Sequence, residues 1–339
     1  MPPSAGLTVA VTGPTGEIGK PFIRALEDCE EVARIVGMAR RPFDPTEHGW
    51  TRTEYRQGDV LDADAVAGLV ADADVVVHLA FIIQASGDSR EVNLRGSRNV
   101  FTATAAAGVP RLVYASSVAA YGFHDDAPEL LTEDVPTRGT DRHPYSAQKA
   151  EVEEALAEDL AGSPTQAWVF RPCIVAGPEA TLLVDMIPGI GLGDRLPGAV
   201  RALFDQVPVL KPVLPDPGLP FQLVHHDDVA EALVAAVLGR GEPGVYNLAG
   251  PGVCGVGDIA AALGWYSVPI PELAVDATAE IVARLPFLPP EAHWIEAFRQ
   301  PVLMDSTRAR SLLGWAPKHD AQETLRATVA AARPRLAPG

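Results

Sequence analysis

The chain has 339 residues, of which 47% are hydrophobic, and a formal net charge of −17 at pH 7. Such an acidic chain is not drawn nonspecifically to nucleic acid or to an anionic membrane, so we expect a small-molecule substrate as its main partner. Its three cysteines are too scattered for a disulfide framework or a metal-ligand spacing, and we expect neither a signal peptide nor a membrane-spanning helix. These features favour a cytoplasmic globular protein with a large α/β unit and a smaller lobe.

A glycine-rich turn follows the first strand-like run. Residues 7–12 lead directly into Gly13-Pro14-Thr15-Gly16-Glu17-Ile18-Gly19, and Ile18, Phe22 and Leu26 share one face of the helix expected next. Glycines let the backbone turn sharply and approach a ligand, while the free N–H groups at a helix start face phosphates. The heptapeptide predicts a dinucleotide pyrophosphate site, the alternative being a surface turn that binds nothing.

Apolar runs of strand length alternate with helical patterns along the chain. The runs span residues 7–12, 33–39, 75–79, 112–116 and 167–174, and helical patterns fall near 63–71, 89–107 and 145–160. This alternation predicts an α/β fold with a doubly wound parallel sheet of the Rossmann type and right-handed crossovers.

The composition of the sequence changes after the last of these runs. Residues 179–220 are rich in proline, glycine and large apolar side chains, whereas 221–249 again contain a strand at 221–224, a helix at 227–238 and a strand at 245–249. We therefore expect a dinucleotide-binding domain from residues 1–178 joined by 221–249. Residues 179–220 and 250–339 would build a smaller, mostly C-terminal, substrate-binding lobe.

A tyrosine, a lysine and two serines form the candidate catalytic group. Tyr145 and Lys149 are four residues apart, so they share one face of a helix, where an ammonium group lowers the pKa of a phenol. Ser116 and Ser117 follow a strand, at the sheet edge where ligands of open α/β folds bind. The simpler alternatives are a solvated helix pair and serines that serve only a turn.

Together these motifs resemble the extended branch of the short-chain dehydrogenase/reductase superfamily, the NAD-dependent epimerase/dehydratase group. The resemblance covers nearly the whole chain. Further matching motifs follow in order: Asp59-Val60, His78-Leu79-Ala80, Asn93-Leu94-Arg95-Gly96, residues 114–122, Arg171-Pro172, Gly177-Pro178, residues 224–230, Tyr246-Asn247 and residues 313–317.

The resemblance implies a role for each matching residue. Tyr145 is the expected acid/base, Lys149 holds the nicotinamide ribose and lowers the pKa of the tyrosine, Ser117 binds the reacting oxygen, and Asn93 supports a proton relay. The expected dinucleotide contacts are the glycine-turn residues Gly13, Thr15, Gly16, Glu17, Ile18 and Gly19, with Asp59 and Val60 at the adenine, and Leu79, Ala80, Pro172 and Ile174 along the cofactor channel.

The end of the second strand bears on the choice of cofactor. NAD enzymes usually carry an acid there, whereas this chain has Arg40 and Arg41, whose guanidinium groups suit a 2′-phosphate. We therefore expect NADP, with NAD as the alternative in which the two arginines form only an exposed basic turn.

Three departures from the family pattern narrow the reaction. Val118-Ala119 replaces the acidic pair of dehydratases, residues 173–176 lack the asparagine usual in sugar-nucleotide members, and residues 182–210 are rich in apolar side chains. We expect an oxidoreductase that transfers a hydride between nicotinamide and a secondary alcohol or ketone of an apolar or natural-product-type substrate. The alternatives are a redox-neutral nucleotide-sugar epimerase with tightly bound NAD and a noncatalytic cofactor sensor. The apolar residues could also be ordinary core.

Two further features remain. His225-His226-Asp227-Asp228 contains metal-ligand types, but adjacent residues rarely converge on one ion, so we expect no metal and read Asp227 or Asp228 as a helix N-cap. The helix at 89–107 is a candidate surface for a homodimer.

Overall fold

The computed structural model describes residues 6–83, 89–185, 187, 212–270 and 301–336. Among these, no helix is both long and apolar enough to cross a membrane.

A seven-stranded parallel sheet forms the centre of the larger domain. Its strands lie in the order β10-β6-β5-β4-β1-β2-β3, so the strand order reverses between β1 and β4. The strands are β1 (Leu7–Thr12), β2 (Val32–Ala39), β3 (Thr53–Gln57), β4 (Val75–His78), β5 (Arg111–Ala115), β6 (Gln166–Pro172) and β10 (Gly244–Leu248). Ligands of such sheets bind beyond the carboxyl ends of the strands, at the point of reversal.

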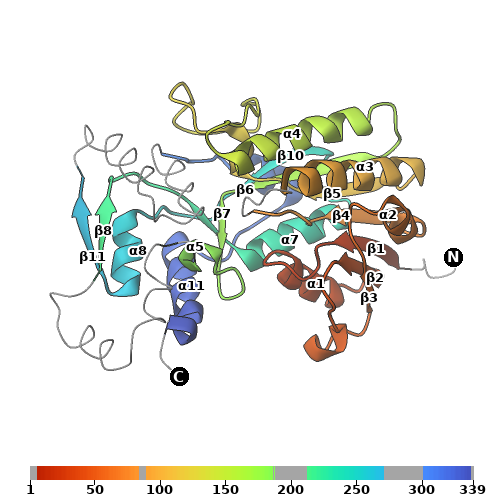
Figure 1. Ribbon diagram of the computed structural model, residues 1–339, viewed down its shortest axis with the longest axis horizontal. Helices are drawn as coiled ribbons and strands as arrows, with labels where there is room; N and C mark the ends of the chain where they lie inside the picture. Colours follow the sequence, from red (N-terminus) through yellow and green to blue (C-terminus); the bar gives the residue numbers. More distant parts are fainter. Residues whose placement is uncertain (1–5, 84–88, 186, 188–211, 271–300, 337–339) are drawn as a thin grey trace.

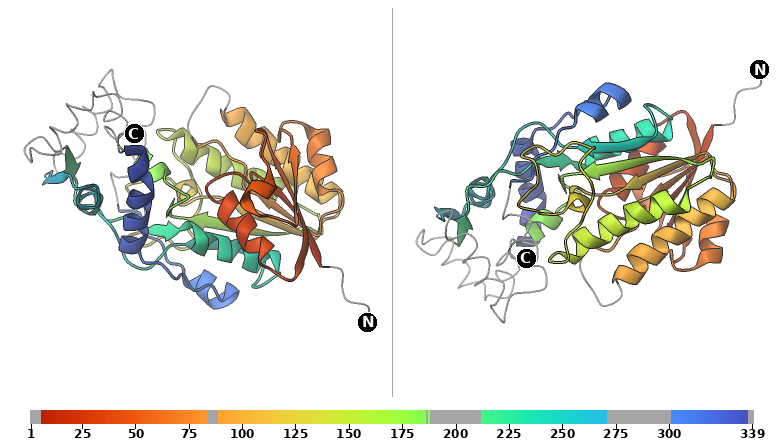
Figure 2. Two further views of the ribbon diagram at one scale, coloured as in Figure 1. Left: turned by 90° about the horizontal axis from the view of Figure 1, so that it is seen from below. Right: turned by 90° about the horizontal axis from the view of Figure 1, so that it is seen from above.

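Helices cover both faces of this sheet (Figures 1 and 2). One face packs against α1 (Gly19–Glu27), α7 (His226–Val237) and α10 (Thr307–Leu313), and the other against α2 (Ala63–Val70), α3 (Gly96–Ala106) and α4 (Pro144–Asp159). Within β1, Val9 and Val11 belong to the first core while Ala10 belongs to the second. Because both faces are buried, the central strands are continuous apolar runs, whereas the edge strand β3 is polar and largely exposed.

A smaller lobe lies at the other end of the molecule (Figure 1). It holds the parallel pair β8 (Val213–Asp216) and β11 (Tyr266–Pro269), with α5 (Leu182–Asp185), α8 (Val256–Leu263) and α11 (Ala321–Leu336). A second parallel pair, β7 (Ile174–Ala176) and β9 (Leu223–His225), joins it to the larger domain. Short helical turns occur at η1 (Pro45–His48), η2 (Glu91–Arg95) and η3 (Val118–Tyr121).

The predicted doubly wound parallel sheet is confirmed, with three corrections in detail. The run at 167–174 is broken, because β6 ends at Pro172 and β7 leaves for a different sheet. The strand near 221–224 pairs with β7, not with the main sheet. The stretch 305–316 does not belong to the lobe, since Ala309, Leu313 and Trp315 are buried in the core that holds α1 and α7.

Candidate functional site

A cavity of about 590 Å³ opens at the carboxyl ends of the central strands. It runs from the glycine turn after β1, past the ends of β4, β5 and β6, to side chains of the smaller lobe. Its walls are mostly apolar, and its volume is typical of a site for a small organic ligand.

Each of the three glycines in the turn has a different structural role. Gly13 has a φ of +75°, and a Cβ there would lie 2.7 Å from the backbone nitrogen of Ala80. A Cβ on Gly19 would lie 2.2 Å from the carbonyl oxygen of Gly13, so helix and turn pack backbone to backbone. Gly16 borders the cavity, and a Cβ there would meet only that same oxygen, at 3.5 Å. The turn thus leaves at Gly16 an open cradle that fits a dinucleotide pyrophosphate.

Ser117 and Tyr145 meet at the cavity wall. Ser117 follows β5 and caps η3, accepting a hydrogen bond from the Ala119 N–H at 3.1 Å. Tyr145 lies in the first turn of α4, which begins at Pro144 and is capped by the His143 ring. Burial raises the pKa of Tyr145 to about 12, although a hydrogen bond with Ser117 opposes the rise. The phenol is therefore protonated at neutral pH, and it stands beside the Ser117 hydroxyl.

Lys149 lies one turn further along α4 and is almost fully buried. Its Nζ donates to the Ala115 carbonyl at 2.8 Å and lies 3.8 Å from the centroid of the Phe81 ring. Burial lowers the pKa of Lys149 to about 7, and the charge of Glu153 opposes that shift. Lys149 Nζ lies 5.8 Å from the centroid of the Tyr145 ring. The expectation that Lys149 lowers the pKa of this phenol stays a prediction.

A buried ion pair supports this group, and no sequence motif indicated it. Arg171 donates from Nε to Glu153 Oε1 at 3.0 Å and from Nη2 to Oε2 at 2.5 Å, and Ser116 donates to the same carboxylate. Glu153 thereby ties together α4, the end of β5 and the end of β6. Its position four residues after Lys149 was a usable signal, but its pairing with Arg171 depends on the strand order.

Most of the predicted site residues line the cavity. They are Gly13, Gly16, Glu17, Ile18, Gly19, Arg40, Leu79, Ser117, Tyr145, Lys149, Pro172 and Ile174, whereas Thr15, Arg41, Asp59, Val60, Ala80 and Asn93 are not in its wall. Phe81, Phe123, His143, Phe221 and Gln222 also line it and were not predicted as site residues. Leu182 and Leu183 line it too, and they belong to the apolar stretch that was expected to favour an apolar substrate.

Asn93 is buried beside the segment that follows β4. Its side chain accepts from the Ile82 N–H at 2.8 Å, and it donates to the Ile82 carbonyl at 2.9 Å and to Gln148 at 2.7 Å. The amide is thus committed to holding the segment that follows β4. The expected part of Asn93 in a proton relay stays a prediction.

Arg40 and Arg41 form a pinned turn after β2. Gln57 donates to the Arg40 carbonyl at 3.0 Å, and the Tyr55 hydroxyl donates to the Arg41 carbonyl. Both arginines are exposed, and within the described residues neither guanidinium makes a hydrogen bond or ion pair. Arg40, at the cavity, is therefore available to an anionic ligand group.

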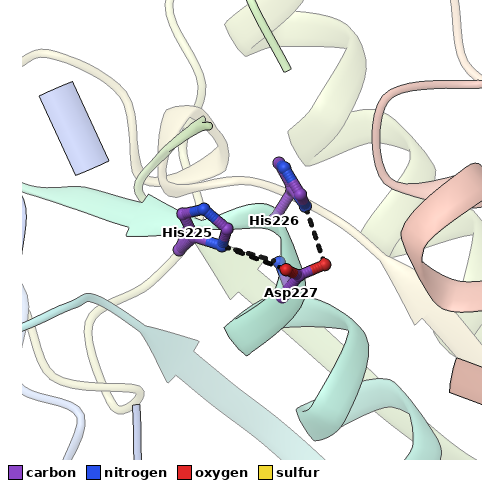
Figure 3. Close-up of side chains that lie close together, drawn as sticks. All are labelled: His225, His226 and Asp227. Atoms are coloured by element: carbon purple, nitrogen blue, oxygen red, sulfur yellow. Dashed lines mark hydrogen bonds and ion pairs between the residues drawn. The ribbon is translucent and has the colours of Figure 1, made fainter. Parts of the chain in front are cut away.

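The His225-His226-Asp227 group is more compact than expected, with candidate ligand atoms all within 4.8 Å of one another (Figure 3). These atoms already have protein partners. His226 Nε2 accepts from the Glu179 N–H at 3.2 Å, so its proton is on Nδ1, which lies 3.0 Å from Asp227 Oδ1. The three side chains therefore form a hydrogen-bonded cluster, and the expectation that no metal binds there stays a prediction.

The expected N-cap for α7 is wrong. His225 caps this helix, since its Nδ1 accepts from the Asp227 N–H at 3.2 Å. Asp228 is fully buried and accepts instead from the backbone of Lys318 and His319. An imidazole cap leaves no distinctive sequence signal beside two aspartates, which are the commoner caps.

The model of a family described as "NAD dependent epimerase/dehydratase family" matches residues 9–249. The human 3 beta-hydroxysteroid dehydrogenase type 7 is 31% identical over an alignment of 213 positions that covers 58% of this chain and 58% of that enzyme. The chain therefore spans less than two thirds of this relative. The Azospirillum brasilense UDP-glucose 4-epimerase is 26% identical over 340 residues, covering 94% of this chain and 89% of that protein.

Solved structures with this fold include a UDP-glucuronic acid 4-epimerase from Bacillus cereus in complex with NAD. It has a TM-score of 0.72 at 18% identity and covers 98% of this chain and 100% of that one. At this identity, the likeness establishes the fold alone.

Proposed function

Because the chain belongs to the NAD dependent epimerase/dehydratase family, we propose that it is an NAD(P)-dependent oxidoreductase acting on a secondary alcohol or ketone of a mainly apolar substrate. One observation carries the proposal: the hydrogen-bonded Ser117 and Tyr145 hydroxyls face a cavity with mainly apolar walls, beside an open glycine turn.

The side chains divide the work of carbonyl reduction. A bound nicotinamide would supply the hydride. The Ser117 and Tyr145 hydroxyls would donate hydrogen bonds to the substrate oxygen and polarise the carbonyl. Since the Tyr145 phenol is protonated at neutral pH, it can deliver the proton that the alcohol oxygen needs. Lys149 would hold the nicotinamide ribose next to the phenol.

The substrate end of the cavity supports an apolar ligand. Phe81, Phe123, Leu182 and Phe221 contribute to the wall, and Arg40 and Lys149 are the only arginine and lysine in the described lining. A sugar nucleotide carries a diphosphate, which needs cationic partners beyond the dinucleotide site. The similarity to a 3 beta-hydroxysteroid dehydrogenase also supports an alcohol on a ring system as substrate. The apolar run at 182–210 lies mostly outside the described residues.

NADP is the proposed form of the cofactor. Arg40 lines the cavity with its guanidinium unpaired in the described part of the chain, and no acid stands at the end of β2 to bind a ribose 2′-hydroxyl. A fork of N–H donors suits a phosphate group on that hydroxyl.

The second candidate is a redox-neutral epimerase. It is favoured by the match over 94% of this chain to a UDP-glucose 4-epimerase, which is longer than the match to the steroid enzyme. Such an enzyme would retain its dinucleotide between turnovers.

A substrate panel separates the two. The protein is mixed with NADP⁺ or NAD⁺ and a 3β-hydroxysteroid, and reduced dinucleotide is followed by absorbance at neutral to alkaline pH; a parallel reaction with UDP-glucose is analysed for UDP-galactose. Steroid oxidation that is lost in Tyr145→Phe supports the proposal. Conversion of UDP-glucose without net dinucleotide reduction would replace it with the epimerase.

A further inference from the structure

The chain crosses from the larger domain to the lobe through a short turn that lies on two imidazole rings. After β7, Gly177 has a φ of +138°, and its carbonyl accepts from the Ala180 N–H at 3.1 Å. A Cβ on Gly177 would lie 2.4 Å from His226 Cδ2 and 3.0 Å from His225 Nε2. Only a glycine lets the turn approach the rings this closely, so the histidines form the floor under residues 177–180.

Three polar contacts hold the same segment against the larger domain. The Glu179 N–H donates to His226 Nε2 at 3.2 Å, and the Glu179 carboxylate pairs with Arg24 of α1. The Leu182 N–H, at the start of α5, donates to Glu17 Oε1 at 3.1 Å. Glu17, expected as a cofactor contact, thus reaches from the glycine turn to the lobe.

Asp227 holds His226 in the tautomer that accepts the hydrogen bond from the Glu179 N–H. Arg24 Nη2 donates to Asp227 Oδ1 at 2.9 Å, and the same oxygen lies 3.0 Å from His226 Nδ1 (Figure 3). An acceptor at Nδ1 places the ring proton there and leaves the Nε2 lone pair for Glu179. Arg24 therefore acts twice, once on Glu179 directly and once through Asp227.

The segment held in this way forms part of the cavity. Leu182 and Leu183 line its wall, as does Glu17 on the opposite side of the Leu182 contact. We propose that Glu17, Arg24 and His226 are positioning residues that fix residues 177–183 over the glycine turn and thereby set the fit of the substrate against Leu182 and Leu183. This inference rests on the proposed function for the identity of the ligand, but the fixing of the segment can be tested without it.

The test compares two replacements of His226 that both remove the ring. In His226→Gln the amide oxygen can reach the place of Nε2 and accept from Glu179, whereas in His226→Asn the shorter amide reaches only the place of Nδ1. Backbone amide exchange of residues 177–183 is measured by mass spectrometry, with and without NADPH. We expect exchange to rise about tenfold in His226→Asn, which equals about 1.4 kcal/mol of lost protection, and by less than about threefold in His226→Gln.

Two further variants serve as a second test and as a control. The contacts of Glu17, Arg24 and His226 with residues 177–183 are called the clasp below. Arg24→Met changes a partly exposed side chain, so it tests the clasp even where His226 variants fold poorly, and it should also raise exchange in 177–183. Glu231→Gln removes the exposed pair of α7 with Lys318 and serves as the control, with exchange in 177–183 unchanged.

Steady-state kinetics with the 3β-hydroxysteroid then separates positioning from stability. In His226→Asn we expect KM to rise about tenfold, with kcat and the Kd for NADPH within about threefold of wild type. Unchanged exchange in both His226→Asn and Arg24→Met would overturn the clasp, and raised exchange with an unchanged KM would overturn its role in substrate fit. A wild-type protein that oxidises no 3β-hydroxysteroid counts against the proposed function, and the exchange results still decide whether the clasp exists.

Discussion

Replacing Lys149 with methionine should stabilise the protein while removing its proposed activity. The folded pKa of Lys149 is about 7, below its ordinary 10.5, so the unfolded chain binds the extra proton between these two values and stability rises with pH across that window. The shift corresponds to a cost of about 4 kcal/mol at pH 7 and about 2 kcal/mol at pH 9. Methionine avoids this cost but leaves the Ala115 carbonyl without its donor, a loss of about 1 kcal/mol.

The net gain in unfolding free energy is therefore about 3 kcal/mol at pH 7 and about 1 kcal/mol at pH 9. A chain of 339 residues has an unfolding entropy of about 0.7 kcal/mol/K, so Tm should rise by about 4 °C at pH 7 and by 1–2 °C at pH 9.

Thermal unfolding followed by circular dichroism, on protein freed of dinucleotide, measures both differences. Lys318→Met is the control, because this lysine is exposed, and its Tm difference from wild type should be small and equal at the two pH values. A Lys149→Met protein that melts below wild type at pH 7, or a Tm gap that does not shrink by pH 9, would refute the reasoning.

Three other changes test separate parts of the site. Tyr145→Phe should lower turnover by about 10²–10⁴-fold in initial-rate assays while NADPH affinity, from fluorescence titration, stays within about threefold; undiminished turnover would remove Tyr145 from the chemistry. Arg40→Ser should weaken NADPH binding by about ten- to hundredfold and leave NADH binding nearly unchanged, so equal losses for both would argue against a 2′-phosphate contact. Glu153→Ala leaves Arg171 buried and unpaired, and urea titration should show about 3–5 kcal/mol less stability, with Glu153→Gln in between; wild-type stability would contradict the role given to this pair.

Local sequence patterns were sufficient for the fold and for the centre of the site. Strand-length apolar runs and the glycine turn located β1, β2, β4 and β5 within a residue or so at each end, because strands buried on both faces must be apolar. The four-residue spacing of Tyr145 and Lys149 placed both on one face of α4, since helix geometry fixes that relation locally.

Contacts between distant segments could not be predicted from local sequence patterns. Glu153 meets Arg171 only because β5 and β6 are neighbours, and Glu17 reaches Leu182 only because the lobe folds back over the glycine turn. The protonation of Tyr145 likewise depends on how deeply α4 is buried, and no spacing of residues reports that burial. Sequence motifs therefore predicted the residues at the centre of the site, whereas their contact partners and protonation depend on the three-dimensional fold.

Native mass spectrometry of the freshly purified protein, before and after adding equal amounts of NADPH and NADH, tests the proposed function most directly. An oxidoreductase must exchange its dinucleotide after each turnover, so the account predicts a protein that is empty as purified and then takes up NADPH in preference to NADH. A protein that keeps one NAD per chain through purification and exchanges it with neither nucleotide would contradict the account and favour the epimerase.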